Sequence, residues 1–136
     1  MEIKTRNRFL VLCALASVLV ASITVSAHHG TAVSYDSSKP ITLKGTVTEF
    51  VFLNPHAQIY FDVKDAAGKV VHWAAELQSP ANLRRDGWSK ETFKPGDQLT
   101  ITPHPSKAGT PVGNVDRSQA VILNGKELPG RAANAE

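Results

Sequence analysis

The chain has 136 residues, a formal net charge of +3 and a single cysteine, Cys13. This length suits one small domain with its own apolar core, and a lone cysteine excludes an internal disulfide framework. A net charge this small does not give the strongly positive surface of a nucleic-acid-binding protein, so a function in nucleic-acid binding is disfavoured.

Residues 1–27 have the three parts of a secretory signal peptide. Three basic residues precede an apolar run that ends at Ser26 and Ala27, the pattern that a signal peptidase cleaves. The apolar run is shorter than the about 20 residues of a comfortable membrane span, and an uncleaved anchor is the alternative. Cleavage after Ala27 would place residues 28–136 in the periplasm or outside the cell, without cysteine, without a membrane anchor, and with twelve basic and eleven acidic residues.

The first half of the expected mature chain predicts an arm and three strands. Residues 28–40 are polar and rich in Gly and Ser, which is typical of an extended arm. Residues 41–53 favour a long strand with a bend or bulge at Gly45. Residues 57–65 and 70–77 alternate between apolar and polar side chains, so they predict a hairpin. The expected inward residues are Ala57, Ile59, Phe61, Val63, Val71, Trp73, Ala75 and Leu77.

A short helix is expected over residues 79–88. Ser79 suits the N-cap, Pro80 the first helical position and Gly87 the C-terminal stop. Trp88, just after this stop, is expected to close one end of the domain.

The remaining segments predict two more strands. We expect a strand within 94–102 with Leu99 and Ile101 inward, a loop at 103–113, a fifth strand within 114–128 and a disordered tail at 129–136. Five short strands hide their edges most simply by closing on themselves. The fold class is therefore mainly β, an OB-like five-stranded Greek-key barrel at 41–128 with one short helix, and a small β-sandwich is the alternative.

Several blocks of the sequence resemble one family of proteins. They are AHH (27–29), GTVTEFVFLNPHAQIYFDVKD (45–65), the spaced Trp, Glu, Ser-Pro, Leu, Arg and Gly-Trp residues of 73–88, KPGD (94–97) and KAGTPVG (107–113). Together they are similar to a family of small exported bacterial proteins known as a domain of unknown function. The His-His start and the internal Asn-Pro-His are the most specific parts. The resemblance implies export and a compact β-rich fold, and it implies no activity or site residues.

Export gives His28 a chemistry that the precursor lacks. After cleavage, its free α-amine and its imidazole can chelate one metal ion, because the second ligand is already tethered to the first. Nitrogen ligands of this type favour Cu(II), with Zn(II) less favoured. The alternative is that His28 and His29 simply begin a solvated arm.

The other histidines differ in how well they suit a role as metal ligands. His56 follows the restrained Asn54-Pro55 corner and is the best third ligand, although a hydrogen-bonded turn residue is the plainer interpretation. His29 would assist from the arm. His104, between two prolines, is a reserve ligand.

A second hypothesis needs no metal. Tyr60, His72 and Glu76 are expected on the outer face of the second and third strands, with Trp73 nearby, where OB-like barrels commonly bind ligands. The sequence thus predicts an exported binding protein without a catalytic motif. Its partner would be a copper ion or, alternatively, an envelope protein or small molecule, and not a nucleic acid.

Overall fold

The computed structural model describes residues 34–116 and 118–130. The expected signal peptide, His28, His29 and residues 131–136 lie outside this range. Within the described part of the chain, no helix has the length and apolar character needed to span a bilayer.

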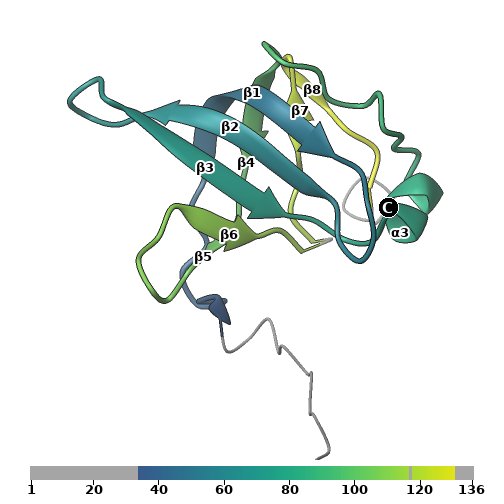
Figure 1. The fold of residues 1–136 in the computed structure, drawn as a ribbon, viewed down its shortest axis with the longest axis horizontal. Helices are drawn as coiled ribbons and strands as arrows, with labels where there is room; N and C mark the ends of the chain where they lie inside the picture. Colours follow the sequence, from purple (N-terminus) through teal and green to yellow (C-terminus); the bar gives the residue numbers. More distant parts are fainter. Residues whose placement is uncertain (1–33, 117, 131–136) are drawn as a thin grey trace, which may run out of the picture.

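The described chain is mainly β, with eight strands in one mixed sheet and a single short helix (Figure 1). The strands are β1 (Leu43–Val51), β2 (Gln58–Lys64), β3 (Val70–Glu76), β4 (Gln98–Ile101), β5 (His104–Pro105), β6 (Val112–Asn114), β7 (Ile122–Leu123) and β8 (Lys126–Glu127). Their order in the sheet is β5-β6-β3-β2-β1-β4-β7-β8. β6 runs parallel to β3, and the other pairs are antiparallel.

The prediction of a mainly β fold with one helix is confirmed, but the OB-like barrel is not. β5 and β8 are the two ends of the sheet and do not pair with each other, so the sheet is not closed. The expected loop at 103–113 contains β5 and the start of β6. The single strand expected within 114–128 is wrong, because this segment holds the end of β6 and a separate β7–β8 hairpin.

The long first strand joins two parts of the sheet. β1 pairs with β4 through its first half and with β2 through its second half. The register shift falls between Val47 and Glu49 rather than at Gly45. A Cβ at Gly45 would lie 2.5 Å from the backbone oxygen of Asp62, so this glycine is required because two strands approach closely here.

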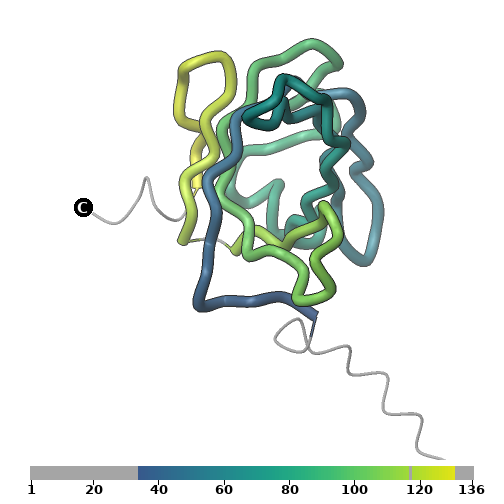
Figure 2. The backbone as a smooth tube through the Cα atoms, turned by 90° about the vertical axis from the view of Figure 1, so that its left-hand side faces the viewer, coloured from purple at the N-terminus to yellow at the C-terminus, as the bar shows by residue number. Residues whose placement is uncertain are grey.

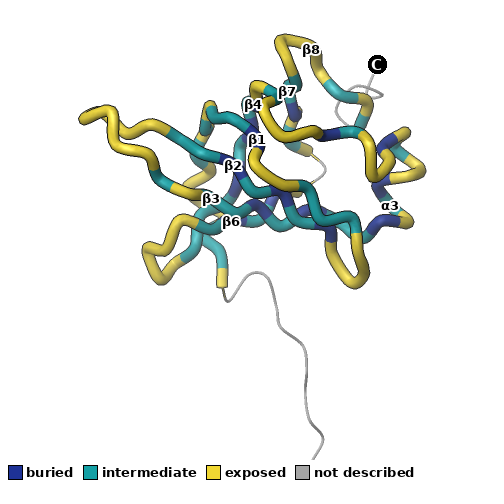
Figure 3. Tube along the Cα trace, turned by 45° about the horizontal axis from the view of Figure 1, so that its top comes forward, coloured by how far each residue is buried: buried dark blue, intermediate teal, exposed yellow. Residues whose placement is uncertain are grey.

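The inner face of the sheet forms the core, as the alternation predicted. Ile59 and Phe61 on β2 and Leu99 and Ile101 on β4 are at most 2 % exposed. No polar or charged residue is buried among the described residues. Exposed positions concentrate in the turns, including the one that joins β2 to β3 (Figure 3).

The predicted helix is present as α3 (Pro80–Arg85). The Ser79 hydroxyl accepts a hydrogen bond from the Asn82 N–H, and Gly87 follows the helix with a φ of 88°. Trp88 is buried, packs edge-on against Phe93, and donates its indole N–H to the Pro129 carbonyl at 2.6 Å. These contacts hold Trp88 between the Phe93 ring and the segment that follows β8.

Candidate functional site

His56, Glu76 and Tyr35 meet at one end of β3. The His56 Nδ1 lies 2.5 Å from Glu76 Oε1, and the Tyr35 hydroxyl donates to Glu76 Oε2 at 3.2 Å. The side chain of His56 is 47 % exposed and that of Glu76 is 22 % exposed. Glu76 is therefore a half-buried carboxylate shared by an imidazole and a phenol.

The turn after β1 places His56 beside Glu76. Backbone hydrogen bonds join Ala57 N–H to the Gln78 carbonyl and Leu77 N–H to the Ala57 carbonyl. The residue before Ala57 is thus held beside the end of β3. The Asn54–Pro55 peptide in this turn is cis.

The arm before β1 carries Tyr35 to the same place. Tyr35 forms a β-bridge with Ser106, while Asp36 N–H bonds to the Pro105 carbonyl and Lys107 N–H to the Ser34 carbonyl. In Figure 2 the first described residues, in dark blue, run beside the loop that joins β5 to β6. Burial, followed by the adjacent Glu76 carboxylate, raises the pKa of Tyr35 above its ordinary value, so the phenol keeps its proton at neutral pH.

Strand register extends this polar group across the sheet. Gln58, Glu76, Asn114 and His104 are successive partners on β2, β3, β6 and β5, so they share one face. Two strand spacings separate His104 from Glu76, about 10 Å between their Cα atoms. His104 therefore belongs to the same row but not to the same contact.

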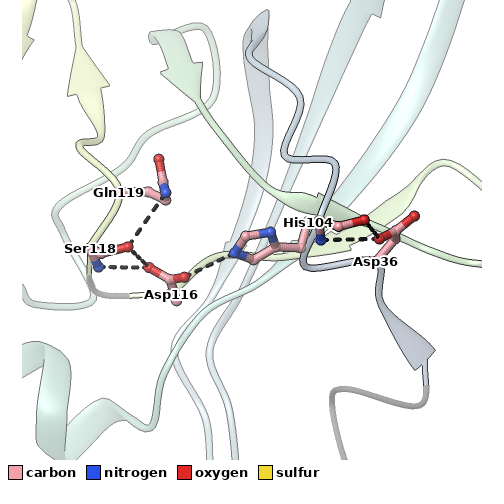
Figure 4. Close-up of polar contacts among 6 residues, drawn as sticks. Asp36, His104, Asp116, Ser118 and Gln119 are labelled. Carbon is pink, nitrogen blue, oxygen red and sulfur yellow. Dashed lines mark hydrogen bonds and ion pairs between the residues drawn. The ribbon is translucent and has the colours of Figure 1, made fainter.

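His104 pairs with a different carboxylate, that of Asp116. Its Nε2 lies 2.9 Å from Asp116 Oδ2, its side chain is 13 % exposed, and its buried Nδ1 has no partner among the described residues. Ser118 hydrogen-bonds the other oxygen of Asp116 (Figure 4). Burial alone would raise the pKa of Asp116, but the hydrogen bonds from Ser118 and His104 outweigh it and lower the pKa. A metal ion at His104 would have to displace Asp116 from Nε2 or reach the buried Nδ1.

The residues predicted for the outer face are only partly brought together. His72 pairs with Asp62 at 2.6 Å in an exposed position, and the Tyr60 hydroxyl donates to Gln58 Oε1 at 2.6 Å. Trp73 lies on the opposite, inner face and packs partly against the core. A shallow hollow over Ala74 is lined by Tyr60 and His72, among others.

The structure adds Asp62, Asp116 and Tyr35 to the predicted site residues, which already included Glu76. Each of the three described histidines contacts a different carboxylate: Glu76, Asp62 or Asp116. None of these three contacts was predicted from the sequence. Tyr35 is 41 residues from Glu76 in sequence, and no local pattern predicts such a contact. Within residues 34–116 and 118–130, no three potential ligands among His, Cys, Asp and Glu gather into a metal site.

The comparisons place the chain in a family. Searches against curated proteins and against solved structures found no significant match. A model described as a family of unknown function, DUF6152, matches residues 14–124. This match covers most of the chain, including the Asn-Pro-His turn and all strands through β7. The chain therefore belongs to the family of unknown function DUF6152.

Proposed function

We propose that the protein is an exported metal-binding protein that holds Cu(II) between its processed N-terminus and His56. In this proposal a peptidase cuts after Ala27, and the amine and imidazole of His28 form a chelate. His56 supplies a further nitrogen from the body of the protein. The observation that carries the proposal is the contact between His56 and Glu76 where the N-terminal arm joins the sheet.

The His56–Glu76 pair has the form of a supported metal ligand. A histidine that binds a metal commonly donates the N–H of its second ring nitrogen to an acceptor such as a carboxylate. This hydrogen bond sets the tautomer and the ring orientation. With Nδ1 directed at Glu76, the nitrogen left for a metal ion is Nε2. The half-exposed ring of His56 leaves it accessible from solvent.

The position of Tyr35 allows the proposed N-terminus at His28 to reach His56. Tyr35 is tied to Ser106 and hydrogen-bonded to Glu76. His28 precedes Tyr35 by seven residues, and seven extended residues span at most about 25 Å. The chain is therefore long enough for His28 to reach His56. His29 lies on the same tether. His104 is less suited, because its ring nitrogen without a partner among the described residues is buried and because it lies two strand spacings from Glu76.

Calorimetric titration of the processed protein with Cu(II) tests the proposal. We expect one tight site that weakens about 10- to 100-fold in Glu76→Gln, because supporting carboxylates contribute that much to metal affinity. His56→Ala should weaken binding at least as much. His72→Ala is the matched control, since His72 also contacts a carboxylate but lies away from the arm. Equal losses in His56→Ala and His72→Ala would contradict the proposal.

The proposal also predicts a pH dependence. Imidazole and amine nitrogens bind metals only when unprotonated, so affinity should begin to fall below about pH 8, where an α-amine ordinarily protonates, and fall further through about 6.5, where an imidazole ordinarily does. Titrations at several pH values in a buffer that does not bind copper would measure this fall.

A second candidate is a metal-free, OB-like module that binds an envelope protein or small molecule. The hollow whose lining includes Tyr60, His72 and Trp73 favours it. Metal analysis of protein isolated from its native compartment separates the two candidates. Copper at about one ion per chain supports the first, and copper-free protein supports the second.

A further inference from the structure

One edge of β3 has no partner along half of the strand. β3 pairs with β2 from Val70 to Glu76, but with β6 only from Ala74 to Glu76. The segment Val70–Trp73 thus has one open edge within the described structure. Figure 1 shows the β2–β3 hairpin projecting past β6.

Two backbone hydrogen bonds of β3 show which of its residues turn their N–H and C=O groups toward the open edge. Ala74 N–H donates to the Pro111 carbonyl, and the Glu76 carbonyl accepts from Val115 N–H. Even-numbered residues of β3 therefore turn their backbone polar groups toward β6. Because this direction alternates along a strand, Val70 and His72 present two N–H and two C=O groups at the open edge.

This edge lacks the usual features that prevent strand pairing. Exposed edges are commonly protected by charged side chains, prolines or bulges, and the segment reads Val-Val-His-Trp. Val70 is one of the two large apolar residues described as exposed, at 41 %. On the inner face, Val71 lies opposite Val63, and both are only partly buried.

We propose that Val70–His72 pairs with the same segment of a second copy of the chain, antiparallel about a two-fold axis at Val71. In this register Val70 faces the second copy's His72, and His72 faces the second copy's Val70. Each pair exchanges two backbone hydrogen bonds, so all four outward N–H and C=O groups of each edge are satisfied. The ladder ends where β6 begins to occupy the edge at Ala74.

The side chains are complementary in the same register. On the inner face, Val71 meets the second copy's Val71 at the axis and extends the apolar surface. Lys69 comes opposite the second copy's Trp73, where an ammonium group and an indole attract each other. On the outer face, Lys64 lies beside Val70 and Asp62 lies beside His72. Each line of side chains across the two copies therefore begins at Lys64 of one copy and ends at Asp62 of the other, so its two ends carry opposite charges. No like charges face each other.

Sedimentation velocity over a range of protein concentrations tests the proposal, with a chelator present so that metal cannot link two chains. The pairing is short, so we expect a monomer–dimer equilibrium with a Kd between about 10 μM and 1 mM. Val71→Lys should weaken the dimer at least about tenfold, because two like charges then meet at the axis. Val63→Lys is the matched control: it adds the same charge on the same face, one strand away from the open edge.

A charge swap separates lost pairing from lost folding. Val71→Lys and Val71→Glu should each be monomeric alone, whereas an equal mixture should associate again because opposite charges meet at the axis. Wild-type protein that is monomeric up to about 1 mM would overturn the proposal and leave the edge to a strand of another protein. Unchanged association in Val71→Lys, or a mixture that stays monomeric, would also overturn it.

Discussion

The two faces of the sheet differ in what their side chains contribute. The inner face is apolar, and its central residues on β2 and β4 are almost completely buried. The outer face carries the His–carboxylate pairs of His56 and His72, which keep access to solvent. Burial of apolar area is the dominant stabilising term, whereas exposed ion pairs contribute little. The inner face therefore accounts for the fold, and the outer face is free to carry function.

The largest contrast is expected between two neighbours on β2. Phe61→Ala removes a ring that is 1 % exposed, so we expect a loss of about 3–5 kcal/mol in the free energy of unfolding. Tyr60→Ala, one residue earlier on the outer face, should cost much less. Urea denaturation of both variants measures the difference. Equal losses would show that both faces contribute alike to stability.

A smaller effect is expected where β1 crosses β2. Gly45→Ala would put a methyl group 2.5 Å from the Asp62 backbone oxygen, and relieving such overpacking costs about 1–3 kcal/mol. Gly130→Ala is the control, because a Cβ there meets nothing within 4 Å. Thermal denaturation of the two variants should lower the midpoint only for Gly45→Ala. An unchanged midpoint in Gly45→Ala would contradict the close approach.

Acid should reduce stability through carboxylates outside the core. Hydrogen bonds from the Asn124 side chain and the Lys94 N–H lower the pKa of Asp97 below its ordinary value of 3.8, and Asp116 shifts the same way. A lowered folded-state pKa contributes stability that is complete above the unfolded value and disappears as pH falls through the folded value. The free energy of unfolding should therefore decrease as the pH falls below about 4, and this decrease should be smaller in Asp97→Asn. Identical pH profiles for this variant and wild type would contradict it.

The smallest effect is expected at the exposed pair of His72 and Asp62. The His72 side chain is 84 % exposed, and exposed pairs contribute about 0–1 kcal/mol. His72→Ala should therefore leave the denaturation midpoint nearly unchanged. A loss as large as that of Gly45→Ala would show that this part of the outer face also supports the fold.

Local patterns predicted the regular part of this fold and little of its topology. The β2–β3 hairpin and its inward residues followed from strict alternation, and α3 followed from Ser79, Pro80 and Gly87. β5 and β6 are two and three residues long, too short for a periodic signal. The parallel pairing of β6 with β3 joins segments distant in sequence, so the open sheet could not be predicted.

The candidate site shows the same limit. His56 was predicted from its turn, and Glu76 was expected on the outer face, but their contact depends on how the chain returns from Ala57 to Gln78. Tyr35 lies in an arm for which little regular structure was expected. Its contact with Glu76 depends on the bridge to Ser106, which only the tertiary fold creates.

The proposed copper site depends most directly on the nitrogen that processing would create at His28. Cu(II) titration should compare the processed protein with the same protein acetylated at the α-amine of His28. Acetylation leaves both histidines of the arm and every described contact in place but removes the amine as a ligand. We predict at least a tenfold loss of affinity in the acetylated protein. Equal affinity of the two proteins would contradict the N-terminal chelate and with it the proposed copper site.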